Sequence, residues 1–206
     1  MAYSEFTLAK AQNSFNLALN EVKDLFADIQ EVSPSALLTM FLDEYVSLAI
    51  DINSEKARSE FIIAPILGDV RRQLNHQISL FSGKDFDVDS TQGLNGFCDF
   101  ILSYSKEQFF IQAPVVTIAE AKNENIIGGL GQCVAEMVAA QLFNQNTGMT
   151  IDVIYGAVTT GTNWRFLKLQ NSTVWIDTIE YSIRDVDKIL GILLHPFREL
   201  LEKTTA

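Results

Sequence analysis

Residues 97–122 read FCDFILSYSKEQFFIQAPVVTIAEAK, and this stretch contains the two runs that decide the fold. The runs Gly96–Tyr104 and Val115–Lys122 are rich in β-branched and aromatic residues, which favour strands. The second run is almost continuously apolar, as is typical of a strand buried on both faces. We therefore expect two strands of a central sheet that is covered on both sides.

Charged side chains interrupt both runs. Asp99 stands within the first, and Glu120, Ala121 and Lys122 end the second. Because the side chains of a strand alternate between its faces, Glu120 and Lys122 point the same way. A lone buried carboxylate is costly unless it is paired or binds a metal. If the two strands are neighbours, Asp99 and Glu120 come together, and their mutual repulsion favours a shared divalent cation.

The elements on either side of this stretch indicate the fold class. Apolar residues recur at helical spacing before it, and helices and short strands alternate after it. The order predicts an α/β sandwich around a mixed central β-sheet flanked by helices, preceded by an N-terminal helical extension over residues 1–53. We expect helices over Phe6–Gln30, Ala36–Ile50, Ser54–Leu67, Gln132–Asn144 and Ile183–Lys203, an edge strand over Ile78–Asp89, later strands over Ile151–Thr159, Trp164–Leu169 and Thr173–Asp177, and a flexible connector at Gly128, Gly129 and Gly131.

The composition excludes several classes of protein. The chain has 206 residues, 15 Lys and Arg against 26 Asp and Glu, and a net charge of −11. This charge argues against tight non-specific binding of nucleic acid, but a bound divalent cation could still supply positive charge locally. Two cysteines and two histidines, far apart, exclude a disulfide scaffold or a zinc cage. No run reaches the roughly 20 apolar residues of a membrane span, so a cytoplasmic protein without a membrane partner is expected.

The acid on one strand and the acid-x-lysine triplet on the next resemble the PD-(D/E)XK nuclease superfamily. Glu60 lies on the helix where this family often has a further glutamate, and Gln132 lies on the helix after the triplet, where the family often has a glutamine. The resemblance covers roughly residues 54–170. It implies a restriction-endonuclease-like core within a domain over residues 54–206. Two positions depart from the family, with Cys98 in place of a proline and Glu136 in place of a tyrosine found in some branches.

The resemblance implies a metal-dependent nuclease that acts on DNA and leaves a 5′-phosphate and a 3′-hydroxyl. The expected catalytic residues are Asp99, Glu120, Lys122 and Gln132. The expected ligands of Mg²⁺ or Mn²⁺ are Glu60, Asp99, Glu120 and the main-chain carbonyl of Ala121. Carboxylate oxygens are the hard ligands that these ions prefer. Lys122 would position or help deprotonate the attacking water, and Gln132 would orient a ligand or contact the phosphate.

Structural readings of the same residues stay open. Glu120 and Lys122 could form a surface salt bridge worth about 0–1 kcal/mol, Glu60 could lie on a solvated helix face, and Gln132 could cap a helix. The charge of −11 also suits a catalytically silent nuclease-fold module that binds a partner or forms a homodimer through its N-terminal helices. A third reading is a metal-dependent enzyme acting on a small phosphorylated substrate.

Overall fold

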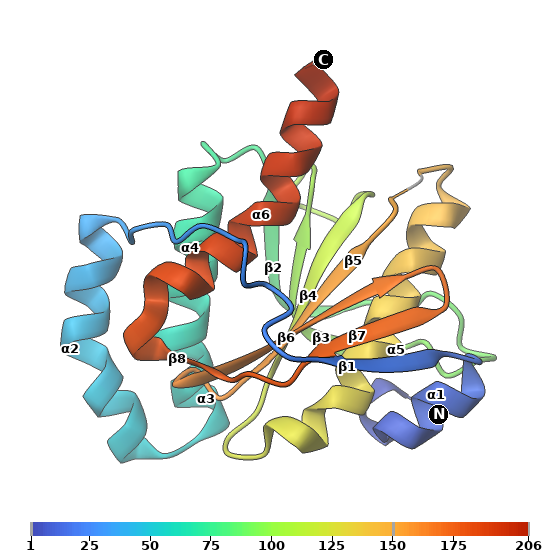
Figure 1. Ribbon diagram of the computed structural model, residues 1–206, viewed down its shortest axis with the longest axis horizontal. Helices are drawn as coiled ribbons and strands as arrows, with labels where there is room; N and C mark the ends of the chain where they lie inside the picture. Colours follow the sequence, from blue (N-terminus) through green and yellow to red (C-terminus); the bar gives the residue numbers. More distant parts are fainter. Residues whose placement is uncertain (1, 150, 206) are drawn as a thin grey trace.

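A computed structural model describes residues 2–149 and 151–205 as three layers, with a mixed eight-stranded sheet between helices (Figure 1). The α/β class with a mixed central sheet is therefore confirmed. The strands are β1 (Ala18–Val22), β2 (Ser79–Asp85), β3 (Phe97–Ser103), β4 (Val115–Ala121), β5 (Ile154–Thr159), β6 (Asn163–Gln170), β7 (Thr173–Asp177) and β8 (Tyr181–Ser182). The α-helices are α1 (Leu8–Ser14), α2 (Ala36–Ile52), α3 (Glu55–Arg58), α4 (Ala64–Gln73), α5 (Ile126–Asn146) and α6 (Val186–Thr205).

The sheet has the order β1-β7-β6-β5-β4-β3-β2, and β8 pairs with β6. Strand β3 pairs antiparallel with both β2 and β4, β4 pairs parallel with β5, and β6 pairs antiparallel with both β5 and β7. The last pair, β7 and β1, is parallel. Strand β2 lies at one edge, which confirms the edge strand expected from the sequence, and β4 lies inside the sheet with every residue buried.

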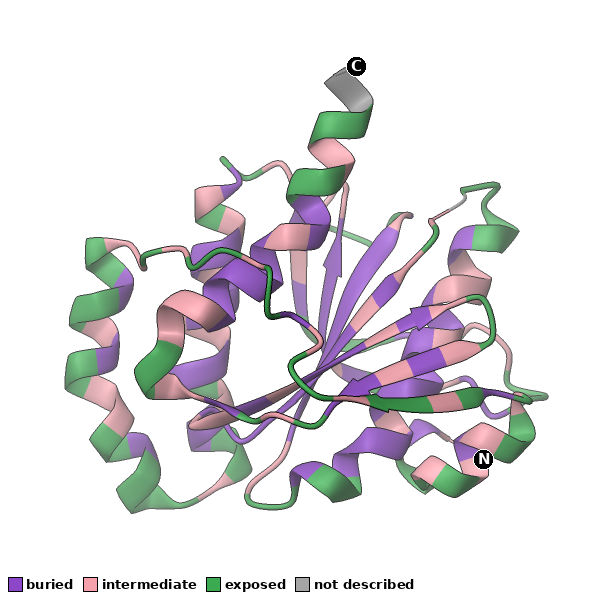
Figure 2. Ribbon diagram, viewed as in Figure 1, coloured by how far each residue is buried: buried purple, intermediate pink, exposed green. Residues whose placement is uncertain are grey.

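Helices cover both faces of the sheet. Helices α4 and α6 pack on one face, with α2 outside α3 and α4, whereas α5 and α1 lie on the other face (Figure 1). The buried residues fall in the strands and on the inward sides of these helices, while the outer side of α2 is largely exposed (Figure 2). Two apolar cores therefore sandwich the sheet, and the face that α5 covers also receives the side chains of Asp99 and Glu120.

The N-terminal segment differs from the sequence prediction. The single helix expected over Phe6–Gln30 is wrong, because α1 ends at Ser14 and the chain then forms β1. Asn16 and Asp24 have φ angles of 51° and 57°, left-handed conformations that interrupt a helix. Residues 1–53 are thus not a purely helical extension, since β1 pairs with β7 and joins the same sheet. Met1 and Ala206, the outer limits of the two predicted segments, lie outside the described residues.

The helical segment expected from Ser54 is confirmed, and it continues to Gln73. The Ser54 hydroxyl caps it by accepting a hydrogen bond from the N–H of Ala57 at 3.1 Å. Between α3 and α4 the chain makes a π-turn over Ser59–Ile63, directly before Pro65. Proline has no N–H to continue the regular helical bonds, and a π-turn is a common adjustment to such a break. The turn changes which side chains of this segment face the sheet.

The glycines before residue 132 are helical and do not form a flexible connector. Helix α5 begins at Ile126, where the side chain of Asn125 accepts a hydrogen bond from the N–H of Gly128 at 2.9 Å. A Cβ atom at Gly131 would lie 2.2 Å from the carbonyl carbon of Thr7, so only glycine lets α5 approach the N-terminal segment this closely. The glycines therefore serve packing here, and the connector prediction is wrong.

Helix α5 is the one helix among the described residues that is long and apolar enough to cross a membrane. In the fold, 61% of the most apolar 18-residue stretch of this helix is buried. It packs along β4 and β5 and contacts α1. Its apolar side chains thus pack within the core of this fold.

Candidate functional site

The side chains of Asp99 and Glu120 meet at the open end of the β3–β4 pair. The antiparallel register pairs Phe100 with Ala119, and extending it by one residue sets Asp99 opposite Glu120. The main chain confirms the proximity, because the N–H of Ala121 donates to Oδ2 of Asp99 at 2.8 Å. Opposite side chains in an antiparallel pair lie about 5 Å apart at Cβ. The sequence prediction that the two strands bring these carboxyl groups together is confirmed.

Glu120 is almost completely buried, with an exposed fraction of 1%. Its Oε1 atom accepts a hydrogen bond from Nζ of Lys122 at 2.5 Å, while its Oε2 atom is buried without a hydrogen-bond partner. Burial and, next, the negative charge of Asp99 raise the pKa of the Glu120 carboxyl to about 8, although Lys122 opposes this shift. The site therefore holds a carboxyl group that needs a positive charge beyond Lys122 to ionise readily.

Lys122 joins this carboxyl to helix α5. Its half-buried Nζ atom bonds to Glu120 and lies 3.3 Å from Oε1 of Gln132. Burial is the largest single influence and would lower the pKa of the Lys122 ammonium, but the charge and hydrogen bond of Glu120, together with the charges of Glu55 and Asp99, raise the pKa overall. The structure thus brings together all four residues expected to be catalytic, Asp99, Glu120, Lys122 and Gln132.

A fifth side chain completes the chain of contacts, and the sequence analysis assigned it no role. Nε2 of Gln132 donates to Oε1 of Glu136 at 3.0 Å, one turn further along α5. Glu136 is fully buried, its Oε2 atom has no hydrogen-bond partner, and burial raises its pKa well above the ordinary value. The sequence did contain a signal for Glu136, because residues four apart on a helix share one face and Gln132 was already a candidate.

Glu60 does not join this group. Its side chain is 56% exposed and forms an ion pair with Lys56, Nζ to Oε1, at 3.5 Å. The negative charge that acts on Lys122 from this part of the chain belongs to Glu55, in the first turn of α3. Glu60 falls inside the π-turn, which alters the helical phase after Arg58. Residue spacing for a regular helix could not have anticipated that change.

The donor set suits a small, hard divalent cation. No group of three Asp, Glu, His or Cys side chains in residues 2–149 and 151–205 is placed to hold a metal ion by itself. Mg²⁺, however, is commonly bound by one or two carboxylates together with waters and substrate phosphates. Asp99 and Glu120 supply two carboxyl groups, and Oε2 of Glu120 is buried without a hydrogen-bond donor to satisfy it. The residues therefore fit Mg²⁺ or Mn²⁺ held with help from the main chain and the substrate.

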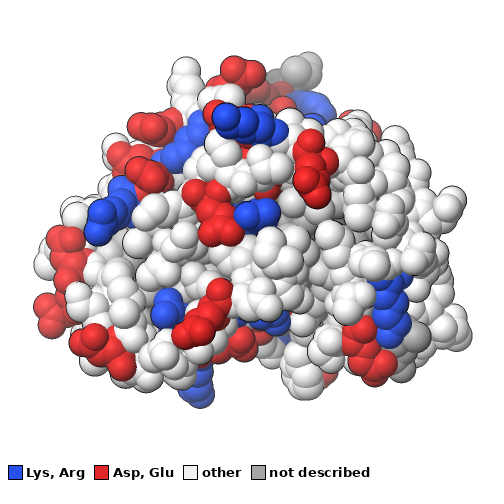
Figure 3. All heavy atoms as spheres, turned by 60° about the horizontal axis from the view of Figure 1, so that its bottom comes forward, with Lys and Arg blue, Asp and Glu red and all other residues white. Residues whose placement is uncertain are grey.

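The surface toward the lower side of Figure 1 has charges of both signs. Figure 3 brings this side forward, and acidic and basic side chains alternate there without forming a continuous basic stripe. The net charge of −11 agrees with this picture. Affinity for a polyanion would therefore depend on a few local cationic contacts, since the surface as a whole does not attract phosphate.

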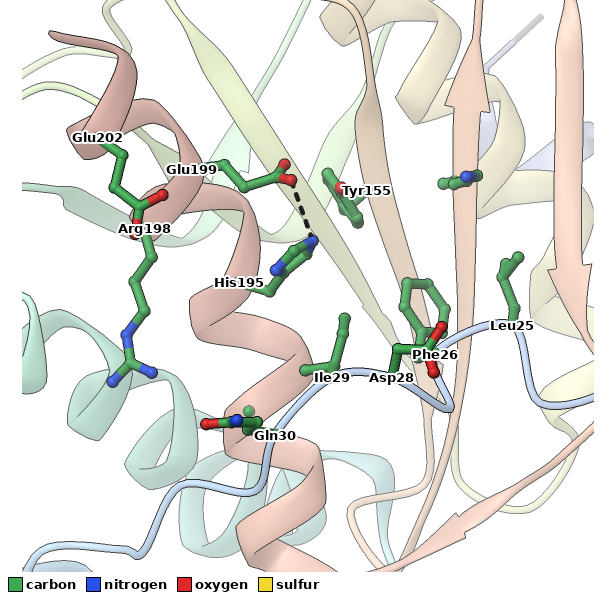
Figure 4. A pocket seen from close by; sticks show the side chains of 12 residues that line it. Leu25, Phe26, Asp28, Ile29, Gln30, Tyr155, His195, Arg198, Glu199 and Glu202 are labelled. Carbon is green, nitrogen blue, oxygen red and sulfur yellow. Dashed lines mark ion pairs between the residues drawn. The ribbon is translucent and has the colours of Figure 1, made fainter. Parts of the chain in front are cut away.

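A separate hollow of about 490 Å³ lies on the opposite face of the sheet, between α6 and residues 25–30. Figure 4 shows His195 and Glu199 of α6 facing Tyr155, with Asp28 across the opening. His195 and Glu199 lie 3.5 Å apart, and burial together with Glu199 raises the pKa of Tyr155 to about 12. Its charged groups are of mixed sign, and no residue of the Asp99–Glu120 group lines it.

Neither protein-family models nor the curated proteins contain a match to this chain.

Proposed function

We propose that this protein hydrolyses phosphodiester bonds in nucleic acid, with DNA as the first substrate to test, using a divalent cation. The observation that carries the proposal is the contact chain Asp99–Glu120–Lys122–Gln132 where β3, β4 and α5 meet. The order of elements also supports it. A helical segment, three antiparallel strands, a helix and a parallel strand follow each other as in the PD-(D/E)XK nucleases that the sequence resembles.

Asp99 and Glu120, with the carbonyl of Ala121, would hold Mg²⁺ or Mn²⁺. When bound, such an ion stabilises charge on a phosphoryl oxygen and makes a bound water more acidic. A cation held beside Glu120 would lower the raised pKa of this carboxyl and favour its ionised form. The cation would also compete with Lys122 for the Glu120 carboxylate.

Lys122 is then the group that acts on the substrate. Its ammonium would position the attacking water and stabilise negative charge on the phosphoryl oxygens. Gln132 holds Lys122 from the side of α5, and Glu136 in turn accepts a hydrogen bond from Gln132. We assign Gln132 and Glu136 to positioning, because their hydrogen bonds reach the reaction only through Lys122.

The test is a cleavage assay on linear, supercoiled and single-stranded DNA and on RNA, with Mg²⁺ or Mn²⁺. We expect activity that chelation abolishes and that Asp99→Asn and Lys122→Met each reduce at least about 100-fold. The exposed-site variant Glu21→Gln, which makes the same charge change as a Glu120→Gln substitution, should retain activity. Absence of cleavage with every substrate, or full activity in Asp99→Asn, would contradict the proposal.

A cytoplasmic location belongs to the same proposal. Cys98 and Cys133 are both free and buried, and burial raises the pKa of each thiol. Such cysteines behave as small apolar residues in the core. They agree with a reducing compartment, and labelling of the native protein by a thiol reagent should be slow at both positions.

A second candidate, a silent module that forms a homodimer, is favoured by one observation. Helix α2 exposes large apolar side chains on its outer face, namely Leu37, Met40, Leu48, Ile50 and Ile52. Deleting residues 1–53 would remove a strand of the sheet, so a point substitution is the cleaner test. Light scattering should show a dimer that Met40→Glu dissociates if this candidate is correct. A wild-type monomer would exclude it.

A further inference from the structure

A hollow of about 380 Å³ lies next to the Asp99–Glu120 group, and we call it the Arg58 hollow. It is enclosed by the end of α3, the turn that leads into α5, and the turn between β5 and β6. Its polar lining includes Arg58, Asn123, Asn125, Thr160, Thr162 and Asn163. Asn123 directly follows Lys122, whose N–H donates to the carbonyl of Thr159 at 2.8 Å. The hollow and the candidate catalytic residues are thus neighbours on one edge of the sheet.

Arg58 is the unusual residue of this hollow. Its exposed fraction is only 9%, yet it has no ion-pair partner among the described residues. Its guanidinium donates to the carbonyl of Thr160 at 3.2 Å, to Oγ1 of Thr162 at 3.4 Å and to Oδ1 of Asn53 at 3.4 Å, all neutral acceptors. Its Nε atom has no partner. A buried charge without a counter-ion is costly, so an anion bound beside Arg58 would be stabilised by the guanidinium charge.

The acidic residues near the hollow do not meet this need. Glu180 lines it, but its carboxylate pairs with Arg165 at 2.9 Å and also accepts from Asn163. Glu124 also lines it and is exposed to solvent. In a chain with 26 acidic residues, leaving one buried arginine unpaired is conspicuous. The anion that pairs with Arg58 is therefore expected to come from outside the chain.

We propose that the Arg58 hollow binds a phosphate group of the nucleic-acid strand, next to the phosphodiester that the Asp99–Glu120 group would cleave. Arginine suits this task because its planar guanidinium donates paired hydrogen bonds to phosphate oxygens. Neutral side chains such as Asn123 and Thr160 add further polar contacts, and α5 begins beside the hollow with the positive end of its dipole. This inference rests on the proposed function for its choice of a strand phosphate over a free one.

The test measures binding without cleavage, using a fluorescently labelled single-stranded oligonucleotide in EDTA at several salt concentrations. We expect Arg58→Gln to weaken binding about tenfold and to reduce the salt slope by about 0.7, the loss of one phosphate contact. Arg72→Gln removes an exposed arginine on α4 and should change affinity less than twofold. Equal binding by Arg58→Gln and wild type would overturn the proposal.

Arg58 also holds the β5–β6 turn, so its replacement could unfold the protein. Ile127 offers an independent variant, because it lines the hollow with an exposed fraction of 58%. Ile127→Glu places a negative charge at the rim without touching the bonds of Arg58, and it should weaken oligonucleotide binding about fivefold. Ile127→Gln, of the same shape without the charge, should bind as wild type does. Equal affinities of the Glu and Gln variants would overturn the proposal.

Two further measurements distinguish a strand phosphate from a small phosphorylated ligand, and this inference from the proposed function. Inorganic phosphate should compete with the oligonucleotide only weakly, at millimolar concentration. Phosphate binding that depends on Arg58 while oligonucleotide binding does not would assign the hollow to a small phosphorylated ligand and overturn the strand-phosphate proposal. Glu21→Gln, on the exposed strand β1, should keep metal-free oligonucleotide binding. Arg58-dependent binding without any cleavage would refute the proposed function alone, whereas cleavage with Arg58-independent binding would refute this inference alone.

Discussion

Replacing Glu120 with glutamine should make the protein more stable at high pH and not at low pH. In the folded protein burial, with Asp99, raises the pKa of Glu120 from 4.5 to about 8. Between these values the unfolded chain releases the proton that the folded chain keeps. Folding stability therefore falls as the pH rises from about 5 toward 8, and this loss is complete above about pH 8.

The size of the effect follows from the two pKa values. Each pKa unit corresponds to about 1.4 kcal/mol, so the cost of Glu120 grows by about 4 kcal/mol between about pH 5 and pH 8.5. The opposing influence of Lys122 is already contained in the folded pKa. Glutamine cannot ionise, so Glu120→Gln removes this pH dependence while nearly preserving the shape of the side chain.

The assay is urea unfolding of both proteins across this pH range, followed by circular dichroism. We expect the difference in unfolding free energy to move by about 4 kcal/mol in favour of the variant as the pH rises. Glu21→Gln, which removes an exposed carboxyl on β1, controls for net charge and should show no such movement. Parallel stability curves for Glu120→Gln and wild type would refute the reasoning.

Two other changes have directions set by the structure. Asp99→Asn removes a negative charge that raises the pKa of Glu120, so carboxyl NMR should show a lower Glu120 pKa in the variant; an unchanged or higher value would contradict the assigned cause. Gly131→Ala should destabilise the protein by about 2 kcal/mol or more in urea unfolding, because its Cβ would overlap the main chain at Thr7. Gly68→Ala on α4, where a Cβ meets no atom within 4 Å, should instead stabilise it by about 0.5–1 kcal/mol, and equal effects at the two glycines would refute this packing argument.

The sequence predicted the centre of the site because strand alternation is local and regular. Asp99 and Glu120 interrupt apolar runs, and pairing of the two runs was enough to bring them together. Apolar residues at helical spacing predicted the helix that carries Gln132, and the family resemblance singled out Gln132 on it. These inferences needed no information about side chains distant in the sequence.

The features that the sequence analysis missed or predicted wrongly have other causes. Strand β1 is mostly exposed and has no alternating apolar pattern, and its partner β7 lies about 150 residues away, so no local signal marked it. Glu60 lies within the π-turn before Pro65 and pairs with Lys56, whereas the charge that acts on Lys122 from this segment belongs to Glu55. Arg58 looked like any helical arginine, because its burial depends on turns that come a hundred residues later.

The most direct test of the central claim is calorimetric titration of the metal-free protein with Mn²⁺ in two buffers of different ionisation enthalpy. We expect about one ion per chain, proton release near pH 7 because Glu120 gives up its proton, and loss of both signals in Asp99→Asn. Binding without proton release, binding that survives in Asp99→Asn, or no binding would contradict a cation site between Asp99 and Glu120.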